Sequence, residues 1–328
     1  MKKDIFINIG LALVTVFLVL GAAEIIMRFA WKMGKLPDRP LYQRSSDPYL
    51  RWELKPGSHH ACVEVNSDGY RGPVRPVRKP ANTFRVLMLG DSETLSLLTS
   101  EQDTLAAQLE NILNAKSTGS CYEVLNFGVE GYNTFSELEQ LKVKGLKYDP
   151  DLIILNYCLN DPDPAEYYFS DSFWMRHSAL ARYFSTRIKK ASIKKERKKA
   201  NIKNEADFIL YLHQPKYFLP VQRAMQEIAD IAKARGNKFA VVIFPSSGKG
   251  VEDFKEKYPF AGVHKLIKSI PSDNIVFIDL MDEFNQLGLD PVKVSIDYYH
   301  DESHKNAATL RISAEYIYGI LKSEKVIP

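Results

Sequence analysis

Short apolar runs alternate with longer amphipathic stretches from about residue 84 onward. The run 84–89 is rich in strand-forming residues and ends at a glycine followed by polar residues, as a buried parallel strand does. Similar runs lie at 122–126, 151–157, 239–244 and 274–280, and helical stretches include 104–115, 134–146, 217–235 and 307–321. Strands that alternate with helices predict an α/β domain with a parallel sheet of about five strands.

The N-terminal stretch 5–23 is almost wholly apolar and follows Lys2 and Lys3. At about 1.5 Å per residue it nearly spans a hydrocarbon core about 30 Å thick, and apolar residues continue to Trp31. We interpret it as an uncleaved signal anchor. A cleaved signal peptide is the alternative, because small residues at 21–23 suit a peptidase. A buried core helix fits the length and position less well.

Two further regions differ in composition from the alternating pattern. Prolines are scattered through 34–82, and the turn-forming sequence at 66–72 predicts a small β preface packed against the core. The chain therefore divides into an anchor at 1–33, a linker with the preface at 34–82, and a main domain at 83–328.

The main domain contains an insertion at 163–215 that begins with aromatic residues and becomes strongly basic. The aromatic residues are Tyr167, Tyr168, Phe169, Phe173 and Trp174, and the basic ones include Arg182, Arg187, Lys189, Lys190, Lys194, Lys195, Arg197, Lys198 and Lys199. Such a segment can form a lid or substrate wall and meet anionic lipid or an anionic polysaccharide. A solvated helical face explains the charges equally well.

Composition limits the classes of function. With 328 residues, 45% of them hydrophobic, the chain can bury a large core, and a net charge of +4 does not indicate a nucleic-acid partner. The three cysteines, Cys62, Cys121 and Cys158, have no metal-ligand spacing, and no cofactor is expected. In an exported domain, Cys62 and Cys121 are the first candidates for a disulfide.

A candidate nucleophile follows the first predicted strand, in the sequence Gly90-Asp91-Ser92. Ligands of open α/β sheets bind beyond the carboxyl ends of the strands, where Ser92 would lie. The same tripeptide is also ordinary turn chemistry. A serine needs a base to accept its proton, and usually a carboxylate that orients the base.

Asp301 and His304 supply such a pair at positions i and i+3. In a turn or a first helical coil these side chains can lie on one side and touch. Asn306 marks the start of the last helix directly afterwards. Asp297 and His300 repeat the spacing and form the alternative pair.

Donors for a developing oxyanion can come from two other strand ends. Asn126, Gly128 and Gly131 follow the second strand, and Asn160 and Asp161 follow the third. Glycines allow close approach of backbone amides, and an asparagine amide is a second kind of donor. Each of these segments is also a common loop sequence.

In this order the four segments resemble the blocks of the SGNH hydrolases, also called GDSL esterases and lipases. The resemblance covers the chain from about residue 85 to the C-terminus and implies a flavodoxin-like three-layer α/β/α sandwich. It implies Ser92 as nucleophile, His304 as base and Asp301 as its partner. The oxyanion hole would comprise the Ser92 and Gly131 amides and the Asn160 side chain, with Asp91, Asn126, Gly128 and Asp161 supporting it. The chain departs from the family at Cys158 and Ser96, where glycine is usual.

The combined reading predicts a membrane-anchored serine esterase that needs no metal or organic cofactor. His304 would deprotonate Ser92, which attacks an acyl ester, with O-acetyl groups on an envelope glycan or lipid as the expected substrate. The resemblance favours a cytoplasmic N-terminus and an exported, bacterial catalytic domain. An O-acyltransferase that uses the same acyl-enzyme and an inactive polysaccharide-binding or assembly protein are the alternatives.

Overall fold

The computed structural model describes residues 2–32, 40–47, 49–50, 52–163, 178–248, 251–297 and 301–328. The chain forms two compact units. We call Met1–Pro40 with Tyr167–Asn201 the anchor unit, and Leu41–Glu166 with Ile202–Pro328 the sheet unit.

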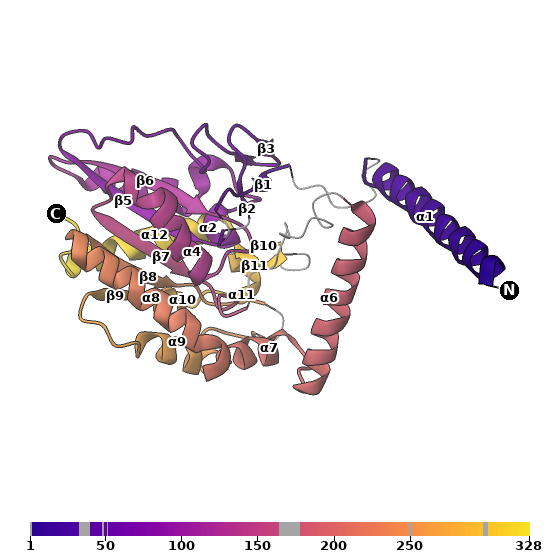
Figure 1. Ribbon diagram of the computed structural model, residues 1–328. Helices are drawn as coiled ribbons and strands as arrows, with labels where there is room; N and C mark the ends of the chain where they lie inside the picture. The colour runs from indigo at the N-terminus through magenta and orange to yellow at the C-terminus, as the bar shows by residue number, and fades with distance from the viewer. Residues whose placement is uncertain are drawn as a thin grey trace. The chain divides into compact units, whose positions relative to one another are not determined.

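A five-stranded parallel sheet is the centre of the sheet unit (Figure 1). Its strands are β5 (Thr83–Gly90), β6 (Cys121–Gly128), β7 (Leu152–Tyr157), β8 (Lys238–Ile243) and β9 (Ile275–Asp279). Their spatial order is β6-β5-β7-β8-β9, which in chain order is the flavodoxin-like order 2-1-3-4-5. The predicted parallel α/β sheet of five strands is confirmed, with every strand within two residues of its predicted bounds.

Helices cover both faces of this sheet. They are α2 (Ser92–Leu95), α3 (Leu105–Lys116), α4 (Thr134–Gln140), α7 (Glu205–Leu212), α8 (Pro215–Arg235), α9 (Ala261–Lys268), α10 (Leu280–Gln286), α11 (Pro291–Val294) and α12 (Ala307–Ser323), with short helical turns η1 (Glu101–Asp103), η2 (Leu141–Gly145) and η3 (Leu146–Tyr148). α3 packs with α12, and α4 packs with α8. The connection from β5 to β6 runs along the sheet in the direction opposite to the connections from β6 to β7 and from β7 to β8. Because such connections are right-handed, α3 and α12 lie on one face of the sheet and α4 and α8 on the other, which gives three layers.

The core lies between these layers. The central strands are buried on both faces, and Val86, Leu89, Ile153 and Val241 are completely inaccessible to solvent. A near-continuous apolar run is what a doubly covered parallel strand requires, because neither face meets water. The loops that follow the carboxyl ends of these strands are therefore held on a rigid support.

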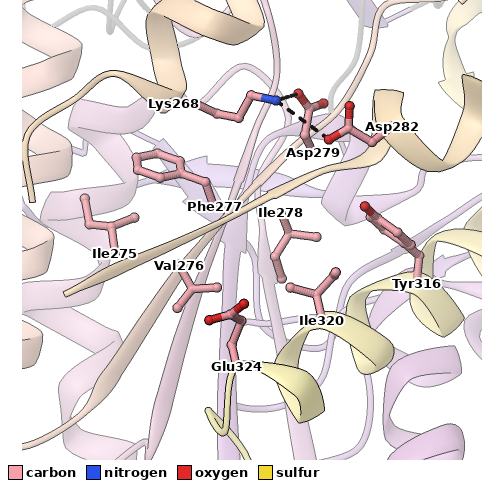
Figure 2. Close-up of a pocket in the computed structure, with 10 residues that line it drawn as sticks. All are labelled: Lys268, Ile275, Val276, Phe277, Ile278, Asp279, Asp282, Tyr316, Ile320 and Glu324. Carbon is pink, nitrogen blue, oxygen red and sulfur yellow. Dashed lines mark ion pairs between the residues drawn. The ribbon is translucent and has the colours of Figure 1, made fainter. Parts of the chain in front are cut away.

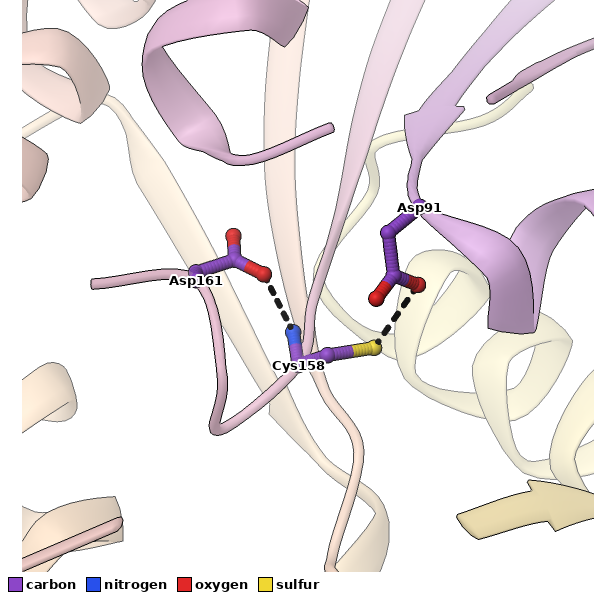
Figure 3. A group of neighbouring side chains, drawn as sticks. All are labelled: Asp91, Cys158 and Asp161. Carbon is purple, nitrogen blue, oxygen red and sulfur yellow. Dashed lines mark hydrogen bonds between the residues drawn. The ribbon is translucent and has the colours of Figure 1, made fainter. Parts of the chain in front are cut away.

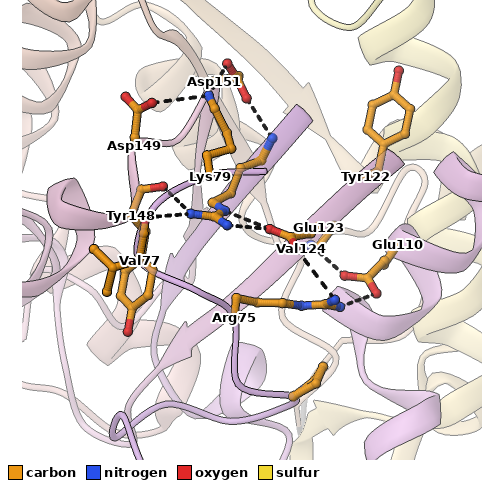
Figure 4. Close-up of polar contacts among 12 residues, drawn as sticks. Arg75, Val77, Lys79, Glu110, Tyr122, Glu123, Val124, Tyr148, Asp149 and Asp151 are labelled. Carbon is orange, nitrogen blue, oxygen red and sulfur yellow. Dashed lines mark hydrogen bonds and ion pairs between the residues drawn. The ribbon is translucent and has the colours of Figure 1, made fainter. Parts of the chain in front are cut away.

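Short strands before β5 form a preface on the sheet unit. They pair as two antiparallel hairpins, β1 (Tyr42–Arg44) with β2 (Trp52–Leu54), and β3 (His59–His60) with β4 (Val63–Glu64). Figure 4 shows ion pairs that fasten the following segment to the core: Arg75 contacts Glu110 at 2.6 Å and Lys79 contacts Asp151 at 2.7 Å. Cys62, Cys121 and Cys158 are all free cysteines in the structure.

The chain from α11 to α12 forms a hairpin of β10 (Ser295–Asp297) and β11 (Asp301–Lys305). The expected turn or helical coil at Asp301 is therefore a strand. Its register is irregular, since Ser295 is opposite Lys305 and Asp297 is opposite Asp301. This leaves residues 302–304 opposite a single residue, so the hairpin contains a bulge.

The anchor unit contains α1 (Lys2–Lys32) and α6 (Ala179–Lys199). Within α1, the 25 residues Ile5–Phe29 are long and apolar enough to cross a membrane, and none of that stretch is buried by protein. A signal sequence near an N-terminus has the same properties. The aromatic residues expected at the start of the insertion, 167–174, lie outside the described residues.

Candidate active site

Three of the four predicted blocks follow three neighbouring strands. Ser92 follows β5, Gly131 follows β6 and Asn160 follows β7, and β5 lies between the other two. Because the strands are parallel, all three residues emerge at the same edge of the sheet. Ser92 and Asn160 flank the β5/β7 position, where the strand order reverses and where flavodoxin-like folds bind ligands.

Ser92 is the first residue of the short helix α2. Asp91 caps this helix, since its carboxylate oxygen Oδ1 accepts a hydrogen bond of 2.9 Å from the Glu93 amide. The Ser92 side chain is half-buried, and its hydroxyl has no hydrogen-bond partner among the described residues. The strand thus turns directly into a helix that presents a partly accessible hydroxyl.

The residues of the second block hold α2 against β6. A Cβ added to Gly128 would lie 2.3 Å from the Leu95 nitrogen, so only glycine permits this approach of helix and strand. Asn126 is buried, donates to the Thr94 carbonyl at 2.8 Å and accepts from the Gly128 amide at 2.9 Å. Gly131 has φ of 76°, in the left-handed region that favours glycine.

The third block packs around Asp91, as Figure 3 shows. The Cys158 thiol donates to Asp91 Oδ1 at 3.2 Å, and the Cys158 amide donates to Asp161 Oδ1 at 3.3 Å. The Asn160 side-chain amide donates to Asp91 Oδ2 at 3.3 Å. The thiol that replaces the usual glycine is therefore a hydrogen-bond donor to the carboxylate beside Ser92.

Burial controls the protonation of these groups. It raises the pKa of the Cys158 thiol well above its usual value, and the Asp91 carboxylate adds to this effect. Burial likewise raises the pKa values of Asp91 and Asp161. Cys158 thus stays a neutral thiol and is unsuited to be a nucleophile, because the thiolate is the reactive form.

Asp91, Cys158 and Asp161 have potential metal-ligand atoms within 4.8 Å of one another. Their oxygens already accept hydrogen bonds from the Glu93 and Cys158 amides, and Asp161 Oδ2 also accepts one of 2.6 Å from the Thr134 hydroxyl. The donor set fits a hydrogen-bonded support for the turn at Ser92 better than a metal centre.

The C-terminal end of α2 has two features that the sequence pattern did not reveal. Ser96 adopts a left-handed conformation with φ of 55°, which explains why glycine is usual there, and its hydroxyl donates to the Glu93 carbonyl at 2.8 Å. Arg71 of the preface is completely buried below this end. Its guanidinium donates to the carbonyls of Cys62, Leu95, Ser96 and Thr99 and to the Glu101 carboxylate, at 2.5–3.1 Å.

The fourth block meets α2 through a buried ion pair. Lys305 Nζ lies 2.9 Å from Glu93 Oε1, and the Lys305 amide donates to Glu93 Oε2 at 3.1 Å. Both side chains are at least nine-tenths buried. Glu93 follows Ser92 and Lys305 follows His304, so this pair fastens the two segments together.

His304 is half-buried. Burial raises the pKa of Asp91, and an electrostatic interaction with His304 offsets part of this rise, so the imidazole lies within electrostatic range of the turn that holds Ser92. The structure describes the backbone of Asp301 but not its side chain. His300 of the alternative pair lies outside the described residues, as does the Asp297 side chain. The predicted start of the last helix at Asn306 is confirmed, and the Asn306 side chain caps it by accepting from the Thr309 amide at 3.0 Å.

A second histidine and carboxylate pair lies elsewhere in the sheet unit. His264 Nδ1 is 2.7 Å from Asp279 Oδ1, a partner 15 residues away that the sequence did not reveal. The imidazole is completely buried, and its Nε2 contacts the Tyr258 hydroxyl at 3.2 Å. Substrate cannot reach this ring, so the pair is structural.

A pocket beside the edge strand β9 contains none of the predicted site residues (Figure 2). It is lined by Lys268, Ile275, Val276, Phe277, Ile278, Asp279, Asp282, Tyr316, Ile320 and Glu324. β9 and β5 are separated by two strands in the sheet. This pocket is therefore separate from the carboxyl edge at Ser92.

Comparison with known proteins gives similarity at the level of structure. The sequence matches no protein-family model and no curated protein. The acetyl xylan esterase AlAXEase is similar, with 16% identity, a TM-score of 0.45, and coverage of 72% of this chain and 98% of that one. A putative lipolytic protein of the G-D-S-L family from Desulfitobacterium hafniense DCB-2 has 12% identity and a TM-score of 0.45 over 72% of this chain and 99% of its own.

A two-domain esterase (CEX) active on acetylated mannans is similar at 11% identity and a TM-score of 0.46, over 75% of this chain and 50% of that one. At these identities and TM-scores, the similarities assign no activity or substrate to the chain. The strand order and the position of Ser92 after β5 come from the structure of the chain itself. By that order, with the helices on both faces of the sheet, the chain has a flavodoxin-like three-layer α/β/α fold.

Proposed function

We propose that this chain is a serine esterase whose nucleophile is Ser92. The observation that carries the proposal is the buried contact between Glu93 and Lys305, 212 positions apart in the sequence. It joins the residue after the candidate nucleophile to the residue after the candidate base. A hydroxyl and an imidazole in these positions, beside three potential oxyanion donors, are the components that acyl transfer requires.

In the proposed reaction His304 accepts the hydroxyl proton of Ser92 while the serine oxygen forms a bond to the ester carbonyl carbon. Asp301 holds the imidazole in the tautomer that can accept this proton. The imidazolium then protonates the leaving alcohol as the ester bond breaks. Water, deprotonated by the same imidazole, attacks the acyl-serine, which releases the carboxylic acid and restores the hydroxyl.

The oxyanion would be held by the backbone amides of Ser92 and Gly131 and by the side-chain amide of Asn160. The Ser92 amide is at the N-terminus of α2, where no intrahelical partner exists for it. Asn160 is exposed, and its contact with Asp91 is long at 3.3 Å. This amide can therefore turn from Asp91 to a bound substrate at little energetic cost.

The proposed substrate is an acyl ester, with O-acetyl groups on a cell-envelope glycan first and lipid esters second. The support for an envelope location is α1, whose apolar stretch is long enough to anchor the chain in a membrane. We place the sheet unit on the exported side of that membrane. Serine chemistry of this kind needs no metal or organic cofactor.

Turnover of p-nitrophenyl acetate by the full chain in detergent tests the proposal. The wild-type chain should hydrolyse the ester, and Ser92→Ala should reduce kcat to the background rate with an unchanged unfolding temperature. Ser100→Ala, which removes another half-buried hydroxyl eight positions away, is the matched control and should retain activity. Full activity in Ser92→Ala would rule out this nucleophile.

Two other functions use the same residues. An O-acyltransferase would pass the acyl group from Ser92 to a sugar hydroxyl, and product analysis with and without a glycan acceptor separates transfer from hydrolysis. A binding or assembly module without activity is the other alternative, and its motivation is the presence of Cys158 and Ser96 at positions where the SGNH hydrolases usually have glycine. A folded chain in which Ser92 is inert to a fluorophosphonate would support the binding module.

A further inference from the structure

Helix α6 of the anchor unit is strongly basic. Its 21 residues include nine lysines or arginines and one glutamate. Among the side chains that the structure describes, the exposed cations are Arg187, Lys194, Lys195, Lys198 and Lys199. The helix therefore presents a dense positive charge to its surroundings.

Two large apolar side chains are exposed on the same helix. Phe184 is 54% exposed and Ile188 is 69% exposed, and they are neighbours at positions i and i+4. A helix that combines exposed cations with exposed apolar residues is typical of segments that lie at a membrane interface. A polyanionic glycan would bind the cations but would leave the aliphatic Ile188 without a matching partner.

The first turn of α6 is fastened to α1 by one carboxylate. Glu24 accepts hydrogen bonds from the Ser178 hydroxyl at 2.7 Å and from the Ala179 and Leu180 amides at 2.9 Å. Glu24 also pairs with Arg28 on its own helix at 2.7 Å. Because three donors at the N-terminus of α6 bind this one carboxylate, they fix the position along α1 at which α6 begins.

The position of Glu24 along α1 matches one surface of a bilayer that α1 would span. Ile5, the first residue of the apolar stretch, and Glu24 are 19 residues apart. At about 1.5 Å per residue this is roughly 28 Å, close to the hydrocarbon thickness of about 30 Å. If α1 spans a bilayer from Ile5, Glu24 reaches the opposite edge of the hydrocarbon core, and α6 starts among the headgroups.

We propose that α6 lies on the membrane surface and binds anionic phospholipid headgroups, with Glu24 as the contact that positions it. The proposal rests on the membrane anchoring proposed for α1. Basic side chains next to a membrane span are attracted to anionic lipid within a Debye length, about 8 Å at physiological ionic strength.

The test uses the full chain with Cys62→Ser and Cys121→Ser, and with Ile188→Cys labelled by the fluorophore NBD. Cys158 is buried and can remain. The protein is reconstituted into vesicles of phosphatidylcholine alone or of phosphatidylcholine with phosphatidylglycerol. We expect a blue shift of NBD emission and quenching by spin-labelled lipid in the anionic vesicles only, and loss of both effects at high salt.

The triple variant Lys194→Glu, Lys195→Glu, Lys198→Glu should abolish the blue shift. The matched control reverses three exposed lysines of the sheet unit, Lys255, Lys265 and Lys293, and should leave the shift unchanged. Glu24→Ala should reduce the shift although it adds no negative charge, because α6 then loses the contact that positions it.

Vesicle flotation separates this proposal from the anchoring on which it rests. A chain that floats with neither kind of vesicle is not membrane-anchored, and both proposals fail. A chain that floats with both kinds while NBD emission is equal in them overturns the α6 proposal alone. A shift caused by alginate added to neutral vesicles, without one in anionic vesicles, overturns it in favour of an anionic polysaccharide.

Discussion

Removal of the Lys305 ammonium group should destabilise the sheet unit more than the loss of any surface ion pair. In Lys305→Met the Glu93 carboxylate stays buried and loses the ammonium group. It keeps the hydrogen bond from the backbone amide of residue 305. At 2.9 Å and an effective dielectric constant of about 20, the gross attraction lost is about 6 kcal/mol. Breaking a buried ion pair on one side typically costs about 3–5 kcal/mol, because the partner is left uncompensated.

The free energy of unfolding, measured in urea, checks this prediction. Glu93→Gln with Lys305→Met should recover most of the loss, because a pair replaced on both sides leaves no buried charge. At a temperature where all variants are folded, Lys305→Met should also react more slowly than wild type with a fluorophosphonate, by about tenfold for every 1.4 kcal/mol that the barrier rises. The double variant should react faster than the single one.

The matched control is Lys142→Met. Lys142 Nζ lies 2.9 Å from Glu139 Oε1, the same distance as in the buried pair, but the lysine side chain is 33% exposed. Its removal should change stability by at most about 1 kcal/mol. Equal losses in Lys305→Met and Lys142→Met would refute the reasoning, since the argument depends on burial rather than on distance.

Three further predictions concern groups near α2. Gly128→Ala should lower the free energy of unfolding by about 3 kcal/mol or more, because its Cβ would lie 2.3 Å from a backbone nitrogen. Gly319→Ala in α12, which has open space around it, should raise the free energy of unfolding by about 0.5–1 kcal/mol. Urea unfolding that gives the opposite order of stability for the two variants would contradict the packing. Arg71→Met leaves buried carbonyls without their donor and should lower the free energy of unfolding by about 3 kcal/mol or more, whereas an unchanged value would show that water satisfies them. Burial, with the Asp161 carboxylate, raises the pKa of Glu137 well above its usual 4.5. Above pH 4.5 the folded state therefore retains a proton that the unfolded state loses. The free energy of unfolding then falls as the pH rises from 4.5 towards the raised pKa. Glu137→Gln should therefore gain stability over wild type by up to about 1.4 kcal/mol per pH unit in that window, and parallel pH profiles of the two chains would contradict it.

The strands, the main helices and the start of the last helix at Asn306 could be predicted because each depends on local sequence. A buried parallel strand needs an apolar run, and a capped helix needs a polar residue directly before it. The left-handed Ser96 could not be predicted from propensity, since serine seldom adopts that conformation and is here held by its bond to Glu93.

Contacts between distant segments account for what the sequence did not reveal. Glu93 and Lys305, or His264 and Asp279, are ordinary polar residues until the fold brings them together. The strand at Asp301 was missed for a similar reason, because β11 forms only by pairing with β10. Residues that support a site from another segment have no local pattern, whereas Ser92 was found because glycine, aspartate and serine end an apolar run.

Peptide mapping after fluorophosphonate labelling tests the central claim most directly. If Ser92 is activated by His304, the label should be found on the peptide that contains Ser92 in the wild-type chain, and His304→Ala should remove it while the protein stays folded. Labelling of another serine, or none at all on a folded wild-type chain, would contradict the account.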